Sequence, residues 1–272
     1  MRGWRLWLGG LLVQGSEVSD ASEGRALSSL HARHVVLAKR DPPLQVVLPE
    51  ALSEKVALFC AESTSAEEST AARDSITASV RIWSLTVLKV VEASQACLTS
   101  TDNDVRNRGT MLLADVLESL PDPDQGGGSL NEVELTTLLG FFTDRLKDEP
   151  CVREVLRATA NLADRCTPAA SLSPELADAL VQAVDSVFGS VHVQALALSD
   201  RRNAYIILQA AVERGAPIAP AGPEGAAMGL THAMDGERDP RNLTLCFKLV
   251  QHFVKAGACP RALPCAAFMQ AA

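Results

Sequence analysis

The sequence predicts an all-α superhelical solenoid of about four stacked helix pairs, with an irregular N-terminal segment before it. Apolar residues recur at helical spacing over most of the chain, and short breaks rich in proline, glycine or acidic residues separate the runs. An acidic residue followed by an arginine also opens successive runs, and these arginines stand 47, 48 and 40 residues apart, at Arg106, Arg153, Arg201 and Arg241. A period of about 40 to 47 residues is typical of HEAT and armadillo arrays.

The composition suits thin helical layers and disfavours a nucleic-acid partner. Aromatic residues make up only 4% of the 272 residues. The formal net charge is −8, although residues 1–40 carry six basic and three acidic side chains. Binding to a phosphate backbone requires clustered basic side chains. We therefore expect no direct binding to nucleic acid.

Residues 1–75 are expected to form an irregular or weakly structured extension. One short amphipathic helix is possible over residues 49–60, and the Ser/Thr/Glu-rich residues 61–73 are typical of a flexible connection. The arginine-bearing apolar start of residues 1–40 resembles an organelle-targeting peptide, but we favour a disordered extension. No stretch reaches the ~18 apolar residues that a membrane helix needs, so no membrane association is expected.

The helical repeats are expected over residues 76–257. The first pair consists of a helix over residues 76–98 and a second helix that begins at Asp104 as its N-cap. The prolines and glycines of residues 121–129 then end the pair, because proline cannot continue a helix and glycine is conformationally loose. We interpret Gly126–Gly128 as part of a linker.

Three further pairs follow. The second is expected over residues 135–166. The third begins with Ser173 as N-cap and Pro174 at the first helical position. The last helix of the fourth begins after Asp239. Its predicted buried stripe consists of Leu243, Phe247, Val250 and Val254. Residues 258–272 break the pattern and are expected to be an irregular tail of a truncated array.

The recurring acidic and basic residues predict contacts between repeats. Each acid is expected to accept hydrogen bonds from the first turn of a helix, and each arginine to reach an acid of a neighbouring repeat. The resulting ladder would set the rotation between repeats. Its expected members are Asp104, Arg106, Glu149, Arg153, Asp200, Arg201, Asp239 and Arg241.

No motif for catalysis, cofactor binding or metal binding stands out. The five histidines do not cluster, and the seven cysteines are scattered without a Cys-x-x-Cys pair, which is typical of reduced intracellular thiols. The acidic turn at residues 235–239 lacks the alternating ligands of a calcium loop. We therefore expect no enzyme activity, no cofactor and no bound metal.

One turn carries a family resemblance. Residues 234–243 are similar to the N-terminal region of a family of large eukaryotic HEAT-repeat scaffolds named for methyl methanesulfonate sensitivity and nucleotide excision repair. Residues 86–93, 106–109, 144–148 and 191–194 agree with it in the same order. The family-signature residues, for which we expect a structural role more than a contact role, are Asp235, Gly236, Glu237, Asp239, Pro240, Arg241 and Asn242.

The resemblance implies a scaffold of the cytosolic iron–sulfur assembly targeting complex. Such a scaffold promotes maturation of iron–sulfur proteins of DNA repair, replication and transcription. The implied partners are other assembly factors and apo-clients such as DNA helicases and polymerases, in the cytoplasm and nucleus. The family's C-terminal repeats, which dock the other factors, are absent from this chain. Two alternatives stay open, an adaptin- or importin-like transport adaptor and a helical-repeat nucleic-acid binder.

Overall fold

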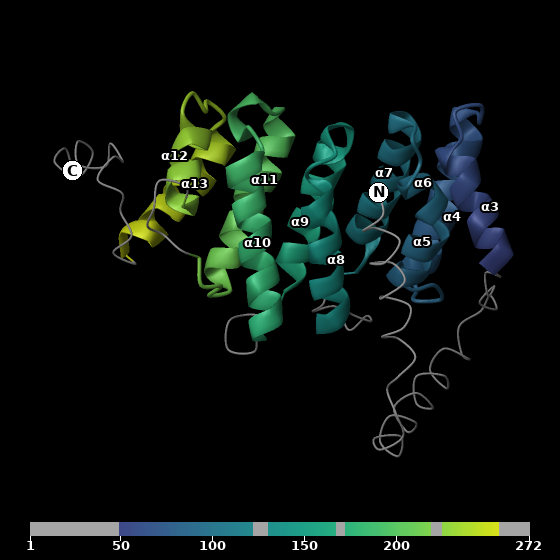
Figure 1. The fold of residues 1–272 in the computed structure, drawn as a ribbon, viewed down its shortest axis with the longest axis horizontal. Helices are drawn as coiled ribbons and strands as arrows, with labels where there is room; N and C mark the ends of the chain where they lie inside the picture. Colours follow the sequence, from purple (N-terminus) through teal and green to yellow (C-terminus); the bar gives the residue numbers. More distant parts are fainter. Residues whose placement is uncertain (1–48, 122–129, 167–171, 219–224, 256–272) are drawn as a thin grey trace, which may run out of the picture.

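The computed structural model describes residues 49–121, 130–166, 172–218 and 225–255, which form eleven α-helices and two short 3-10 helices (Figure 1). These helices stack side by side, so the predicted all-α helical-repeat solenoid is confirmed. The expectations for residues 1–48, for the glycine linker at 126–128 and for the tail at 258–272 lie outside the described residues.

The helical array starts earlier than the sequence suggested. Helix α3 (Pro49–Cys60) buries Leu52, Val56 and Phe59, as predicted. The prediction of a flexible connection over residues 61–73 is wrong, because most of it belongs to helix α4 (Ala66–Arg81). Ser65 and Glu68 form a capping box at its start. Serine and glutamate are also common in loops. The residues that cap this helix therefore have a composition that is typical of a flexible connection.

The single helix predicted over residues 76–98 is also wrong. Helix α4 ends at Arg81, and Trp83 adopts a left-handed backbone with φ of 59°, which interrupts a right-handed helix. The chain resumes as α5 (Val87–Ala93), whose N-cap Thr86 accepts a hydrogen bond from a backbone N–H, and α6 (Gln95–Leu98). The apolar period continues across this break, which is why periodicity alone did not reveal it.

The N-cap of helix α7 (Asn103–Ser119) lies two residues before the predicted one. Asp102, and not Asp104, is the N-cap, because its Oδ1 accepts from the backbone N–H groups of Asp104 and Val105 at 2.7 and 3.2 Å. Asp104 lies inside the first turn and is exposed. Both aspartates suit the positive end of the helix, so composition could not separate the two positions.

The second, third and fourth helix pairs lie where the sequence placed them. They comprise α8 (Glu132–Arg145) with α9 (Val152–Arg165), α10 (Pro174–Ser190) with α11 (Leu198–Glu213), and α12 (Ala226–Met234) with α13 (Pro240–Lys255). The 3-10 helices η2 (Glu149–Cys151) and η4 (Val193–Ala195) lie in the turns before α9 and α11. Ser173 caps α10 with Pro174 at the first position, as predicted.

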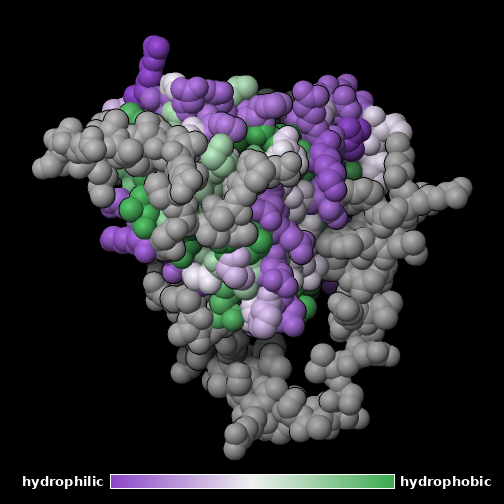
Figure 2. Space-filling model, turned by 60° about the vertical axis from the view of Figure 1, so that its left-hand side comes forward, coloured by the Kyte–Doolittle hydropathy of each residue, from purple (hydrophilic) through white to green (hydrophobic). Residues whose placement is uncertain are grey.

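The predicted buried stripe of α13 is rotated by one residue. The side chains that face the core are Asn242, Cys246, Leu249 and Phe253, whereas Phe247 is 50% exposed. Figure 2 brings this end of the array forward and shows hydrophobic side chains at the surface beside polar ones. Both stripes have helical spacing, so tertiary contacts decide between them.

The helices form two layers around one continuous core. Helices α4, α7, α9, α11 and α13 pack on one another in succession, and α8, α10 and α12 form the second layer. Leucine, valine and alanine fill the space between them. Among the described helices, none is both long and apolar enough to cross a membrane.

Candidate interaction surface

The edge of the array where the helices of each pair meet carries a ladder of arginines. We call it the turn-edge ladder, formed by Arg106, Arg153 and Arg201 with acids of the following repeat. Arg106 lies in α7 and donates from Nε and Nη2 to both carboxylate oxygens of Asp148, at 2.9 and 3.0 Å. This hydrogen bond lowers the pKa of Asp148. Its acid is therefore Asp148, and not the predicted Glu149, which is exposed.

Arg201 forms the most buried pair of the ladder. Its Nε and Nη2 donate to the two oxygens of Glu237 at 2.8 and 3.0 Å, and the Glu237 side chain is fully buried. Asn242 also donates to Glu237 at 3.0 Å and to the Leu198 carbonyl at 3.3 Å. The hydrogen bonds, from Arg201 above all, lower the pKa of Glu237 to about 2. The pair connects α11 with the turn before α13.

Arg153 makes the weakest contact of the three. Its Nε lies 3.8 Å from Oδ1 of Asp200, and its side chain is 74% exposed. An exposed pair at this separation contributes little to stability. The ladder thus reaches each neighbouring repeat from α7 to α13 with unequal strength, and Asp200 is the one predicted acid among its three acceptors.

The family-signature turn serves the fold. Oδ1 of Asp239 accepts from the backbone N–H groups of Arg241 and Asn242, so Asp239 caps α13 as predicted, with Pro240 at its first position. Gly236 has a φ of 77°, which favours glycine. The Arg241 guanidinium donates to both carboxylate oxygens of Asp239 in its own repeat, at 3.3 and 3.4 Å.

A second set of arginines, which sequence reasoning missed, binds the opposite helix ends. Arg165, at the end of α9, donates to the carbonyls of Leu120 and Pro121 after α7, at 2.7 and 2.8 Å. Arg214, after α11, donates to the Cys166 carbonyl at 2.6 Å and to that of Asp164. Each cation satisfies carbonyls at a helix C-terminus. Arg165 and Arg214 are 49 residues apart, close to the repeat period, and this spacing could have revealed them in the sequence.

Carboxylates gather at one place near the N-terminal end. Glu62, Asp102 and Asp104 bring oxygens within 4.8 Å of one another, and all three are exposed. Asp102 already accepts the hydrogen bonds that cap α7. The cluster therefore has a structural role at a helix start.

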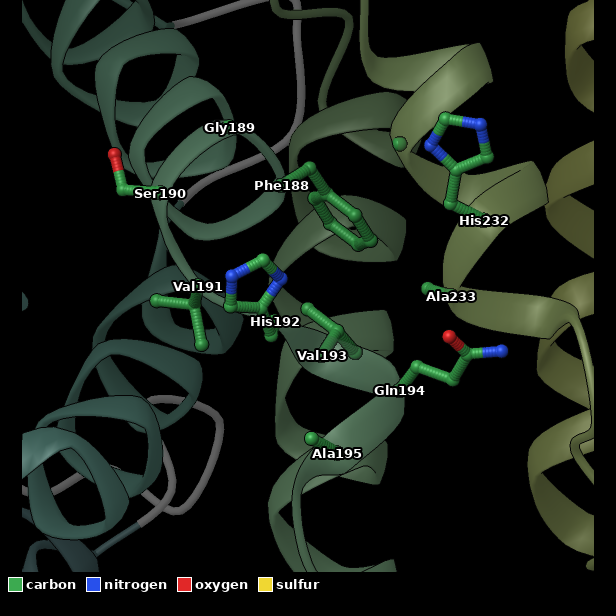
Figure 3. Close-up of a pocket in the computed structure, with 11 residues that line it drawn as sticks. Phe188, Gly189, Ser190, Val191, His192, Val193, Gln194, Ala195, His232 and Ala233 are labelled. Atoms are coloured by element: carbon green, nitrogen blue, oxygen red, sulfur yellow. The ribbon is translucent and has the colours of Figure 1, made fainter.

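A pocket of about 450 Å³ opens between the end of α10, η4 and α12. Figure 3 shows the Phe188 ring between the imidazoles of His192 and His232. Gly229 keeps α12 close to α10, because a Cβ there would lie 2.7 Å from Cβ of Phe188. Gln194 donates to the Asp235 carbonyl at 2.6 Å and joins the pocket rim to the signature turn. Residues 191–194 thus line a surface hollow.

Most of this chain is similar in sequence to known proteins. A family model described as Dos2-interacting transcription regulator of RNA-Pol-II matches residues 91–262. The chain is 30% identical over 207 residues to the MMS19 nucleotide excision repair protein homolog of Arabidopsis thaliana, which covers 76% of this chain and 18% of that protein. The homologs of Mus musculus and Danio rerio are 34% and 35% identical, over 66% and 65% of this chain and 16% of each protein. The chain thus spans less than a fifth of these relatives' length.

Proposed function

The chain belongs to the family of MMS19 nucleotide excision repair proteins, and on this premise we propose that it acts in nucleotide excision repair as a non-enzymatic scaffold. More specifically, we propose that it promotes the maturation of iron–sulfur proteins of DNA repair, replication and transcription, as the family resemblance implies. The iron–sulfur cluster is the cargo in this proposal, and apo-helicases and apo-polymerases are the partners. The sites of action are the cytoplasm and the nucleus.

The observation that carries the proposal is the continuous, cross-linked layer of α7, α9, α11 and α13. Bidentate arginine–carboxylate pairs hold neighbouring repeats in a fixed relative orientation, because both guanidinium nitrogens must align with both oxygens. A stack of repeats with fixed rotation presents an extended surface on which a folded client can dock. The signature residues contribute to this layer, because Asp239 caps α13 and Glu237 binds Arg201 of α11.

Reconstituted binding tests the proposal. Tagged chain is mixed with a purified iron–sulfur DNA helicase, in its apo and its cluster-loaded form, and retention is measured by pull-down. We expect retention of the apo form, because a targeting scaffold must release a client once it is loaded. Failure to retain any iron–sulfur helicase or polymerase, together with recovery of cargo receptors or coat proteins from cell extract, would favour the transport-adaptor alternative.

Two matched variants locate the contact layer. Lys248→Glu reverses one exposed charge on α13, and Asp178→Lys reverses one on α10, in the other layer. Loss of helicase retention in one variant alone identifies the layer that binds. Salt-sensitive binding of the unmodified chain to DNA without any client protein would instead favour the nucleic-acid-binding alternative.

A further inference from the structure

Two buried cysteines lie together near the N-terminal end of the array. Cys60 ends α3 and Cys97 lies in α6, and they are 2% and 8% exposed. Helix α7 brings them together. Arg108 donates to the carbonyl of Ala61, the residue after Cys60, at 2.6 Å, and a Cβ on Gly109 would lie 3.1 Å from Cβ of Cys97. These contacts of two adjacent residues hold the end of α3 and helix α6 against the same part of α7.

The two thiols lie close enough to affect each other's ionisation. Their interaction raises the pKa of Cys60 and lowers the pKa of Cys97, and burial adds to the rise at Cys60. When the pair loses its first proton, the thiol that remains can stabilise the neighbouring thiolate. A thiolate beside a thiol is the arrangement from which disulfides form.

The other buried cysteines provide a contrast. Burial is the main cause that raises the pKa of Cys166 to about 11 and the pKa of Cys246 to about 12. The Cys166 thiol contacts the Leu162 carbonyl, and the Cys246 thiol contacts Tyr205. Neither has a second thiol as a recorded partner within the described part of the chain, so both are suitable internal controls.

The segment around Cys97 is short, and its hydrogen bonding at the helix start is incomplete. Helix α6 has four residues, and its N-cap Ser94 makes no side-chain capping bond. The Ser94 hydroxyl is buried without a hydrogen-bond partner. A buried unsatisfied hydroxyl is costly, so local opening here requires less free energy than opening of the long helices. Brief opening gives a small oxidant access to Cys97.

We propose that Cys60 and Cys97 form a redox-sensitive dithiol that closes to a disulfide in the presence of a peroxide. The Cys97 thiolate attacks one oxygen of hydrogen peroxide, the O–O bond breaks, and a sulfenic acid forms as hydroxide leaves. The Cys60 sulfur then attacks the Cys97 sulfur, the S–S bond forms, and the S–O bond breaks. The Cys60 proton leaves with that hydroxyl group as water. The new bond joins α3 to α6.

Peptide mapping tests the proposal directly. Trypsin cleaves after Lys55, Arg73, Lys89 and Arg106, so Cys60 and Cys97 fall in separate peptides, residues 56–73 and 90–106, each with a single cysteine. The folded chain is treated with hydrogen peroxide, remaining thiols are blocked in urea, and the digest is analysed by mass spectrometry. We expect these two peptides to be cross-linked and lighter by two hydrogens, and separate again after reduction with dithiothreitol.

Three variants complete the test. Cys97→Ser is expected to abolish the cross-link without a sulfenic acid at Cys60. Cys60→Ser is expected to leave a sulfenic acid on Cys97, trapped by dimedone, and the control Cys246→Ser to cross-link like the unmodified chain. Circular dichroism checks that each variant folds. A cross-link that forms only in urea, one that joins other cysteines equally, or none while methionines are oxidised overturns the proposal. Each of these outcomes leaves the proposed scaffold function untouched.

Discussion

At the scale of single residues, one buried carboxylate explains the family-specific turn. Glu237 accepts hydrogen bonds from Arg201 of α11 and Asn242 of α13, and from the backbone N–H groups of Arg238 and Asp239. Hydrogen-bond donors directed at a carboxylate favour its ionised form, and at Glu237 they outweigh the effect of burial, which favours the neutral acid. The turn therefore requires an acidic residue at position 237. This requirement is a structural reason for the family-specific sequence of the turn.

The pKa of Glu237 predicts a pH dependence of stability. Its folded-state value of about 2 lies below the ordinary 4.5, so the stabilisation is complete above pH 4.5 and is lost as the pH falls towards 2. It amounts to on the order of 3 kcal/mol at most. Glu237→Gln is expected to lower the free energy of unfolding at pH 7 and to flatten its decline between pH 5 and 2, measured by urea unfolding. Equal slopes in the variant and the unmodified chain would contradict the assignment.

At the scale of elements, α13 shows how an interaction at a helix start sets the rotation of the whole helix. The stripe at Leu243 and Phe247 and the stripe at Cys246 and Leu249 both have helical spacing. Asn242 donates to Glu237 and to the Leu198 carbonyl and thereby faces inward. Because residues three to four positions apart share a face, Cys246 and Leu249 follow Asn242 into the core.

Paired truncations on α13 test this rotation. Leu249 is 1% exposed and Phe247 is 50% exposed. Leu249→Ala is expected to lower the free energy of unfolding by about 2–5 kcal/mol, since it leaves a cavity in the core. Phe247→Ala, although it removes a larger side chain, is expected to cost about 1 kcal/mol or less. Thermal melting of both variants measures the difference, and the reverse order would restore the stripe predicted from sequence.

At the scale of the whole molecule, two sets of arginines connect the repeats at opposite helix ends. The turn-edge ladder joins α7 to the turn before α9, and α11 to the turn before α13, while Arg165 and Arg214 bind carbonyls at the other end. Stability of a repeat array depends on such interfaces between neighbours. Contacts at both ends keep neighbouring repeats from rotating against each other.

Loss of the two bidentate pairs is expected to weaken this coupling. The double variant Arg106→Ala/Arg201→Ala removes both and leaves Glu237 buried without its cation, at a cost of about 2 kcal/mol for each charged hydrogen-bonded pair. Hydrogen exchange is expected to show α3–α7, α8–α11 and α12–α13 opening independently, with a broader urea transition. The exposed Arg153→Ala is the control, with little expected change. A single sharp transition at the original midpoint in the double variant would show that apolar packing alone couples the repeats.

The sequence by itself determined that the chain is a stack of helix pairs, because the apolar period, proline breaks and caps such as Ser173 and Asp239 act over short distances. It also placed an acid and an arginine near each inter-repeat contact. Tertiary structure alone decided which acid each arginine binds, where the 76–98 run breaks and which stripe of α13 is buried. It also brought Cys60 to Cys97 and formed the pocket at His192. Those outcomes depend on the distances between side chains of different repeats. For α13, two stripes satisfy the helical period equally well, so the period alone cannot say which of them is buried.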